Sequence, residues 1–180
     1  TTLTQILSDR LGFDADKIEI FQGDSAITPP GTTGGARMTT ILGSAVAEVA
    51  AKTIDTARPQ AAEALECAEE EVIFADGVFS SANTNHSITI EDLALRLVPD
   101  NGAHPFDIKH QYETDGATYP YGCHVVELEV DPGTCKVDLL RYTVVDDFGA
   151  VINPMTLEGQ VHGGIAQGIG QAIYEYAAFD

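Results

Sequence analysis

Two glycine-rich segments contain the residues whose types and spacing could bind a ligand. The first is residues 32–39, TTGGARMT, directly before a stretch with helical periodicity. Glycines let backbone N–H groups approach a ligand closely, and a helix N-terminus favours an anion. Arg37 stands where a cation opposes the helix dipole, which is unfavourable unless an anion compensates. Spacing alone leaves two interpretations open, an anion-binding loop or an ordinary glycine-rich loop.

The second segment is residues 159–171, which contain five glycines although the remaining residues favour a helix. At about 1 kcal/mol per glycine relative to Ala, the lost helix propensity is on the order of 5 kcal/mol. The missing side chains therefore make room for a closely packed backbone or for a flat ligand. The carboxamide of Gln160 offers donors and acceptors that suit the edge of a heterocycle. Tight helix packing would explain several of the glycines, but it does not explain Gln160.

Patterns typical of other chemistry are incomplete. Asp147-Phe148-Gly149 spells the metal-binding triplet of kinases, but the sequence has neither their glycine-rich nucleotide loop nor their catalytic-loop motif. There is no nucleophile elbow, the five histidines lack metal-ligand spacing, and the three cysteines form no C-x-x-C pair. We therefore predict no catalytic residue and no metal ligand within this chain.

The composition limits the classes of partner. The 180 residues are 44% hydrophobic and carry a formal net charge of −19. Such a chain has enough apolar material for a core, but it is poorly suited to bind nucleic acid or an anionic membrane surface. No stretch approaches the roughly 20 apolar residues of a membrane span. Widely spaced cysteines, odd in number, favour the reducing cytoplasm. We expect no nucleic-acid partner, no membrane span and a cytoplasmic location.

The elements that must position both segments alternate between helix and strand. Helical periodicity or helix caps predict helices at residues 3–11, 38–58, 59–67, 90–98 and 153–177, with a break at Arg58-Pro59. Residues 17–21 alternate like a half-buried strand, and Asp76-Gly77 and residues 131–134 predict the turns of two hairpins. The class is therefore mixed α and β.

In these segments the sequence resembles the large, molybdenum-binding subunit of the xanthine dehydrogenase and aldehyde oxidase family, which includes molybdenum-type carbon monoxide dehydrogenases. The pattern that carries the resemblance consists of the loop at 33–37, VDDFG at 145–149, INP at 152–154 and GQVHGG at 159–164, followed by Gln167-Gly168. The resemblance covers the whole chain. It implies an α+β fold of mixed sheets with packed helices, and a single, partial cofactor-binding domain over residues 1–180.

The resemblance also implies a cofactor site. Family members bind molybdopterin with its molybdenum, in bacterial members often as the cytosine dinucleotide. Carried over by position, the residues expected to cradle the pterin are Thr33, Gly34, Gly35, Ala36 and Arg37, and Gln160 is expected to bond its edge. Many relatives have Ser at the position of Ala36, so only backbone bonding is expected there.

The implied reaction is oxidative hydroxylation of aldehydes, N-heterocycles or CO, with FAD and 2Fe-2S clusters on other subunits or domains, in a homo-oligomeric parent enzyme. In the family a G-Q-G motif precedes this region, and a Gly-x-Gly-Glu segment, whose Glu is the catalytic base, follows it. Neither motif is in these 180 residues. We therefore expect an interior fragment that is inactive in isolation. Two alternatives stay open: a cofactor-binding or scaffold module that belongs to no enzyme, and a non-catalytic acidic structural or assembly domain whose glycines serve packing only.

Overall fold

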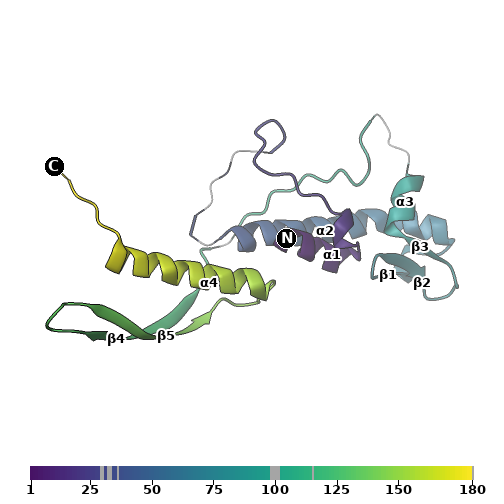
Figure 1. The fold of residues 1–180 in the computed structure, drawn as a ribbon. Helices are drawn as coiled ribbons and strands as arrows, with labels where there is room; N and C mark the ends of the chain where they lie inside the picture. The colour runs from purple at the N-terminus through teal and green to yellow at the C-terminus, as the bar shows by residue number, and fades with distance from the viewer. Residues whose placement is uncertain (29–30, 32–33, 36, 98–101, 115, 180) are drawn as a thin grey trace. The chain divides into compact units, whose positions relative to one another are not determined.

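The chain forms two compact units, Thr1–Thr118 and Tyr119–Asp180, which are described separately (Figure 1). The structure, a computed structural model, describes residues 1–28, 31, 34–35, 37–97, 102–114 and 116–179. Both units combine helices with antiparallel strands. The predicted α+β class is therefore confirmed.

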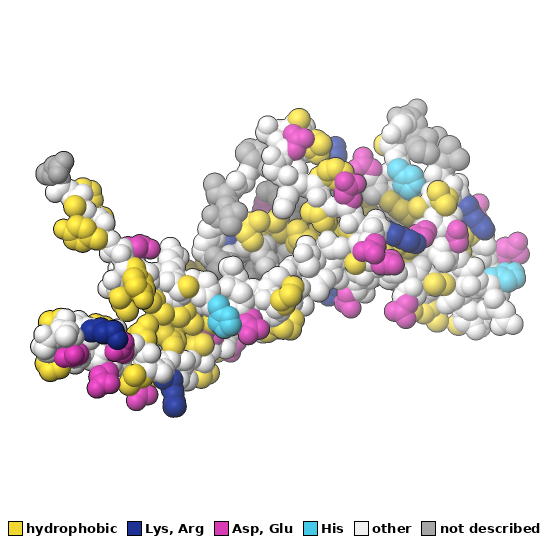
Figure 2. Space-filling view, viewed as in Figure 1, with side chains coloured by type: hydrophobic (Ala, Val, Ile, Leu, Met, Phe, Trp, Pro, Cys, Tyr) yellow, Lys and Arg dark blue, Asp and Glu magenta, His cyan; other side chains and the backbone are white. Residues whose placement is uncertain are grey.

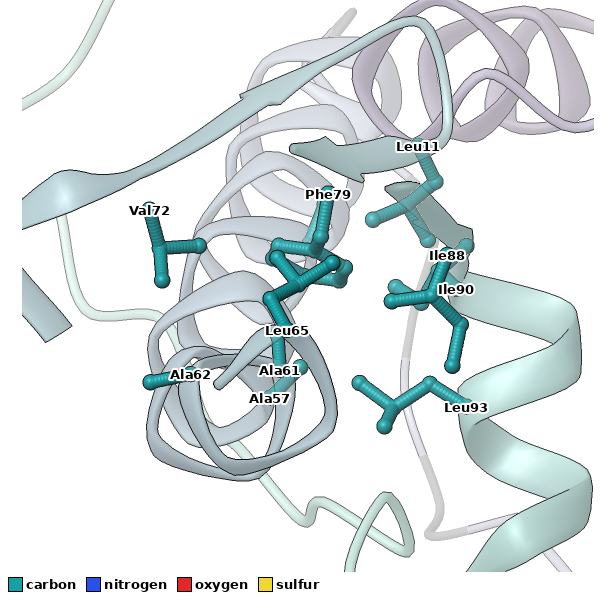
Figure 3. Packing of buried hydrophobic residues seen from close by; sticks show 11 residues of the cluster. Leu11, Ala57, Ala61, Ala62, Leu65, Val72, Phe79, Ile88, Ile90 and Leu93 are labelled. Atoms are coloured by element: carbon teal, nitrogen blue, oxygen red, sulfur yellow. The ribbon is translucent and has the colours of Figure 1, made fainter. Parts of the chain in front are cut away.

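The first unit packs a small sheet against one long helix. Its helices are α1 (Thr2–Leu11), α2 (Met38–Leu65) and α3 (Ile90–Arg96), with short 3-10 turns at Ala15–Lys17 and Glu69–Glu71. Its antiparallel sheet has the order β1 (Val72–Ala75), β2 (Val78–Ser81) and β3 (Ser87–Thr89). Phe79 from β2 meets Leu65 from α2, and Leu93 from α3 closes the same cluster (Figure 3). These three side chains are almost wholly buried, so the first unit has its own apolar core.

The predicted hairpin at Asp76-Gly77 is confirmed. Both turn residues have positive φ, 48° at Asp76 and 78° at Gly77, as a two-residue hairpin turn requires. Gly12 ends α1 with a φ of 70°, and its N–H donates to the Ser8 carbonyl at 2.9 Å. A Cβ on Gly12 would lie 2.7 Å from the Asp76 carbonyl oxygen. The end of α1 and the hairpin turn therefore pack backbone against backbone.

Two predictions for the first unit were wrong. The helix does not break at Pro59, because α2 is continuous from Met38 to Leu65. Pro59 lies on the exposed side, where the freed carbonyl can meet water, whereas Ala57 and Ala61 keep one buried face on both sides of it. Residues 17–21 form no strand, because no described strand lies beside them to pair with, and Phe21 is 63% exposed.

The second unit consists of one long hairpin and one helix. Strands β4 (Tyr121–Val130) and β5 (Val137–Asp147) pair antiparallel, with a bulge at Glu127/Leu128, so the hairpin predicted around residues 131–134 is confirmed. Helix α4 (Pro154–Ile169) begins at the predicted cap, where the Asn153 side chain accepts the Thr156 N–H at 3.0 Å. It ends earlier than the predicted residue 177, because the chain widens into a π turn at Gly170–Tyr174.

The second unit leaves most of its apolar side chains exposed. Because side chains alternate along a strand, Val125 and Val145 project from one face of the hairpin, and Val126 and Tyr142 from the other. Their exposed fractions are 59%, 71%, 42% and 37% respectively. No residue of α4 is buried, and hydrophobic side chains are visible over this unit in Figure 2. In the part of the chain that the structure describes, no helix is long and apolar enough to cross a membrane.

Candidate functional site

The described glycines of residues 32–39 have free space beside them. Gly34 and Gly35 are both exposed, and a methyl group at either would meet no described atom within 4 Å. Gly35 has a φ of 61°, a conformation that side chains other than glycine rarely adopt. Two further predicted site residues, Thr33 and Ala36, lie outside the described residues. The described part of this loop can therefore offer its backbone to a ligand.

The loop leads into the N-terminus of α2. Arg37 is the N-cap residue, and its side chain makes no capping hydrogen bond. The first turn contains no acidic residue, and Met38 to Thr40 are exposed. The first N–H groups of a helix have no partner inside the helix, and they carry its positive dipole end. An exposed cation and uncapped amides at one helix end together suit an anionic group such as a phosphate.

Gln160 lies in the second turn of α4, on a face formed largely of glycine. Its side chain is exposed, and methyl groups at Gly159, Gly163, Gly164 or Gly168 would meet no described atom within 4 Å. No described residue therefore packs closely on this face. The half-buried residues Val161, Ile165 and Ile169 recur every four positions along another side of the helix.

A second carboxamide shares the glycine face. Gln167 follows Gln160 by seven residues, two helical turns, and it is also exposed. Gly163 and Gly164 lie between the two glutamines in the sequence, so a flat group on this face could meet both amides. Gln167 is not among the site residues predicted from the sequence, although the seven-residue spacing could have indicated it.

The turn that leads into α4 is fixed by hydrogen bonds from side chains. The Asp147 carboxylate accepts the Gly149 N–H at 2.9 Å and the Tyr121 hydroxyl at 2.9 Å. These two donors, the Gly149 N–H first, hold the pKa of Asp147 below its usual value. Among the described residues, no group of three or more His, Cys, Asp or Glu side chains could hold a metal ion.

The predicted site residues are divided between the two units. Gly34, Gly35 and Arg37 belong to the first unit, and Gln160 belongs to the second. Within each unit the described residues present exposed donor groups beside open glycines. Their joint action on one ligand stays a prediction.

Comparison with known proteins identifies the family. A profile described as "Molybdopterin cofactor-binding domain" matches residues 1–180. The carbon monoxide dehydrogenase large chain of Hydrogenophaga pseudoflava is 32% identical over all of this chain and 23% of its own length. The nicotine 6-hydroxylase large subunit of Paenarthrobacter nicotinovorans is 31% identical, again over all of this chain and 23% of its own length.

A solved structure shows the same fold. Reconstituted CO dehydrogenase from Oligotropha carboxidovorans superposes with a TM-score of 0.86 at 31% identity, covering all of this chain and 23% of the other. The chain thus spans less than a quarter of the length of these relatives. Because the profile covers every residue, this chain belongs to the molybdopterin cofactor-binding domain family.

Proposed function

We propose that this chain supplies part of the molybdopterin site of a molybdenum hydroxylase large subunit, and that both units belong to one cofactor-binding domain. The observation that carries the proposal is the open glycine face of α4 around Gln160. Five glycines in one helical segment are costly, and no described residue uses the space left at four of them, Gly159, Gly163, Gly164 and Gly168. A flat ligand on this face explains both the glycines and the exposed carboxamide.

The donor groups of the chain fit the chemistry of molybdopterin, which combines a phosphate with a fused heterocycle. We assign the backbone around Gly34 and Gly35, together with Thr33 and Ala36, to the cradle. Arg37 and the uncapped start of α2 would bind the phosphate. Gln160 would hydrogen-bond the heterocycle edge. When bound, the cofactor supplies the molybdenum centre for oxidative hydroxylation. The residues of this chain bind and orient it, and none of them is assigned a proton-transfer role.

The activity of the whole protein follows from its relatives only as a proposal. Two relatives are named for the oxidation of CO and the hydroxylation of nicotine. We propose a substrate within the range of aldehydes, N-heterocycles and CO, and electron transfer through 2Fe-2S and FAD partners in a cytoplasmic homo-oligomer. We further propose that the cofactor carries the cytosine dinucleotide and that the 180 residues alone have no turnover.

The test is Gln160→Ala in the full-length protein, with Glu158→Ala as the matched control. Glu158 is exposed on the same helix but lies on another side of it. Loss of one hydrogen bond worth about 1 kcal/mol predicts about fivefold weaker cofactor retention. The measurements are molybdenum per chain by elemental analysis and the fluorescence of the oxidised pterin. Equal cofactor content in both variants would reject the proposal and favour the assembly domain.

A further inference from the structure

The pair Asp146-Asp147 at the end of β5 has no part in the proposed cofactor contacts, yet both side chains are engaged. Consecutive residues of a strand point to opposite faces. The two carboxylates therefore act on different neighbours, and each neighbour lies near the start of β4, opposite the pair.

Asp146 reaches across the hairpin on one face. Its carboxylate lies 3.3 Å from His124 Nε2, and its side chain is only 13% exposed. The other ring nitrogen of His124, Nδ1, lies 3.0 Å from the Tyr142 hydroxyl. Asp146 Oδ1 occupies the space that a Cβ on Gly122 would fill, and such a Cβ would also lie 2.6 Å from the Val145 carbonyl oxygen. Gly122 is thus required for this contact.

Asp147 accepts hydrogen bonds on the other face of the hairpin and from the turn that follows β5. It joins the Tyr121 hydroxyl on β4 to the Gly149 N–H in the turn. Gly149 has a φ of 70°, the left-handed conformation that favours glycine, within a bend of the chain. Phe148 lines an open depression of about 240 Å³ with Pro120, Gly122, His124 and Asp146, so the first residue after β5 lies beside the start of β4.

The same turn lies shortly before α4 in the chain. Only residues 150–152 separate Gly149 from Asn153, whose side chain caps α4 through the Thr156 N–H. Gln160 lies in the second turn of that helix. The hydrogen bonds therefore run from β4 through Asp147 and Gly149 to within three residues of the cap.

We infer that Asp146 and Asp147 are positioning residues that clamp the end of the hairpin. Asp146 holds the paired strand ends, and Asp147 fixes the turn after β5 and thereby aims α4 and Gln160 at the cofactor. This inference rests on the proposed function. It differs from that function because the clamp uses hydrogen-bond acceptors at positions 146 and 147 that do not contact the cofactor.

The test compares Asp147→Ala with Asp147→Asn in the full-length protein. The Gly149 N–H binds Oδ1 and the Tyr121 hydroxyl binds Oδ2, so Asn, with one amide oxygen, keeps one of the two acceptors, whereas Ala keeps neither. Asp138→Ala is the control, because Asp138 lies on the same strand and pairs with Lys136 in an exposed ion pair. The readouts are hydrogen exchange of residues 148–150, which needs no bound cofactor, and molybdopterin per chain.

For Asp147→Ala we expect at least fivefold faster exchange and about fivefold lower cofactor content, with Asp147→Asn between Asp147→Ala and wild type, and Asp138→Ala within twofold of wild type. The double variant Asp147→Ala/Gln160→Ala should lose no more cofactor than Gln160→Ala, because the clamp acts through Gln160. Wild-type cofactor content in Asp147→Ala overturns the inference, and so does an equal loss in Asp138→Ala. A wild-type protein without molybdopterin would instead overturn the proposed function.

Discussion

Replacing Gly163 by Ala should increase the stability of α4 and weaken the binding of the cofactor. Gly163 lies within α4, has an ordinary helical backbone, and would place its new methyl group in open space. Helix propensity then favours Ala by about 0.8–1 kcal/mol, with no clash to offset the gain. In the cofactor-free protein, we therefore expect α4 to become more stable.

In the loaded protein the same methyl group lies on the proposed ligand face. A Cβ at position 163 would hold a flat ligand away from the helix backbone and lengthen the hydrogen bond from Gln160. Overpacking costs about 1–3 kcal/mol, which corresponds to roughly 5- to 150-fold weaker binding. We therefore expect Gly163→Ala to lower molybdopterin content although it stabilises the helix.

The assay is hydrogen exchange of α4 peptides in full-length protein, made with and without cofactor synthesis, together with molybdopterin per chain. The comparison of the two preparations is the internal control, because the substitution is identical in both. The reasoning is refuted if Gly163→Ala slows exchange in the cofactor-free protein and leaves cofactor content unchanged, because the glycine face would then bind nothing. Faster exchange in the cofactor-free protein would show that another segment packs closely there.

Two further predictions concern stability. Leu65→Ala should lower the free energy of unfolding of the first unit by about 2–5 kcal/mol, because Leu65 is 1% exposed within the core. Urea denaturation measures this free energy. A change below about 1 kcal/mol would contradict the prediction. At Asp131, the Gly133 N–H is the main cause that holds the pKa of the carboxyl below its usual value. The ionised Asp131 carboxyl thus stabilises the turn at pH values above its pKa in the unfolded chain. This stabilisation is lost as the pH falls through the lower pKa that the carboxyl has in the folded protein. Protection of the turn amides, taken as the exchange rate relative to the intrinsic rate at the same pH, should fall on acidification in wild type and not in Asp131→Ala, and equal acid sensitivity of the two would exclude this role.

Local signals predicted the elements whose structure is determined locally. Asp76-Gly77 can adopt the positive φ angles of a tight turn. Asn153 caps the first turn of α4 and Pro154 occupies its first position, and neither needs a contact with a distant residue. Pro59 misled the prediction because the buried face of α2, which is a tertiary feature, outweighs one missing hydrogen bond. Residues 17–21 alternate correctly, but a strand also needs a partner, and alternation does not predict one.

The candidate site was predictable only in part for the same reason. The glycines and Gln160 could be predicted as site residues from the sequence. The loss of helix propensity at a glycine, and the donors and acceptors of a carboxamide, do not depend on distant residues. The contact of Asp147 with Tyr121 spans 26 residues and depends on strand register, so the sequence showed only an acidic pair of unassigned role. Whether Arg37 and Gln160 serve one ligand depends on the placement of two units, which no local pattern encodes.

The exposed apolar hairpin of the second unit has a consequence for protein synthesis. The first unit carries its own core, so we expect it to fold soon after it leaves the ribosome. β4 and β5 pair only with each other among the described strands, which leaves both outer edges and both apolar faces uncovered. Such surfaces promote aggregation until another segment covers them. We therefore expect the nascent second unit to bind chaperones until another segment covers these surfaces.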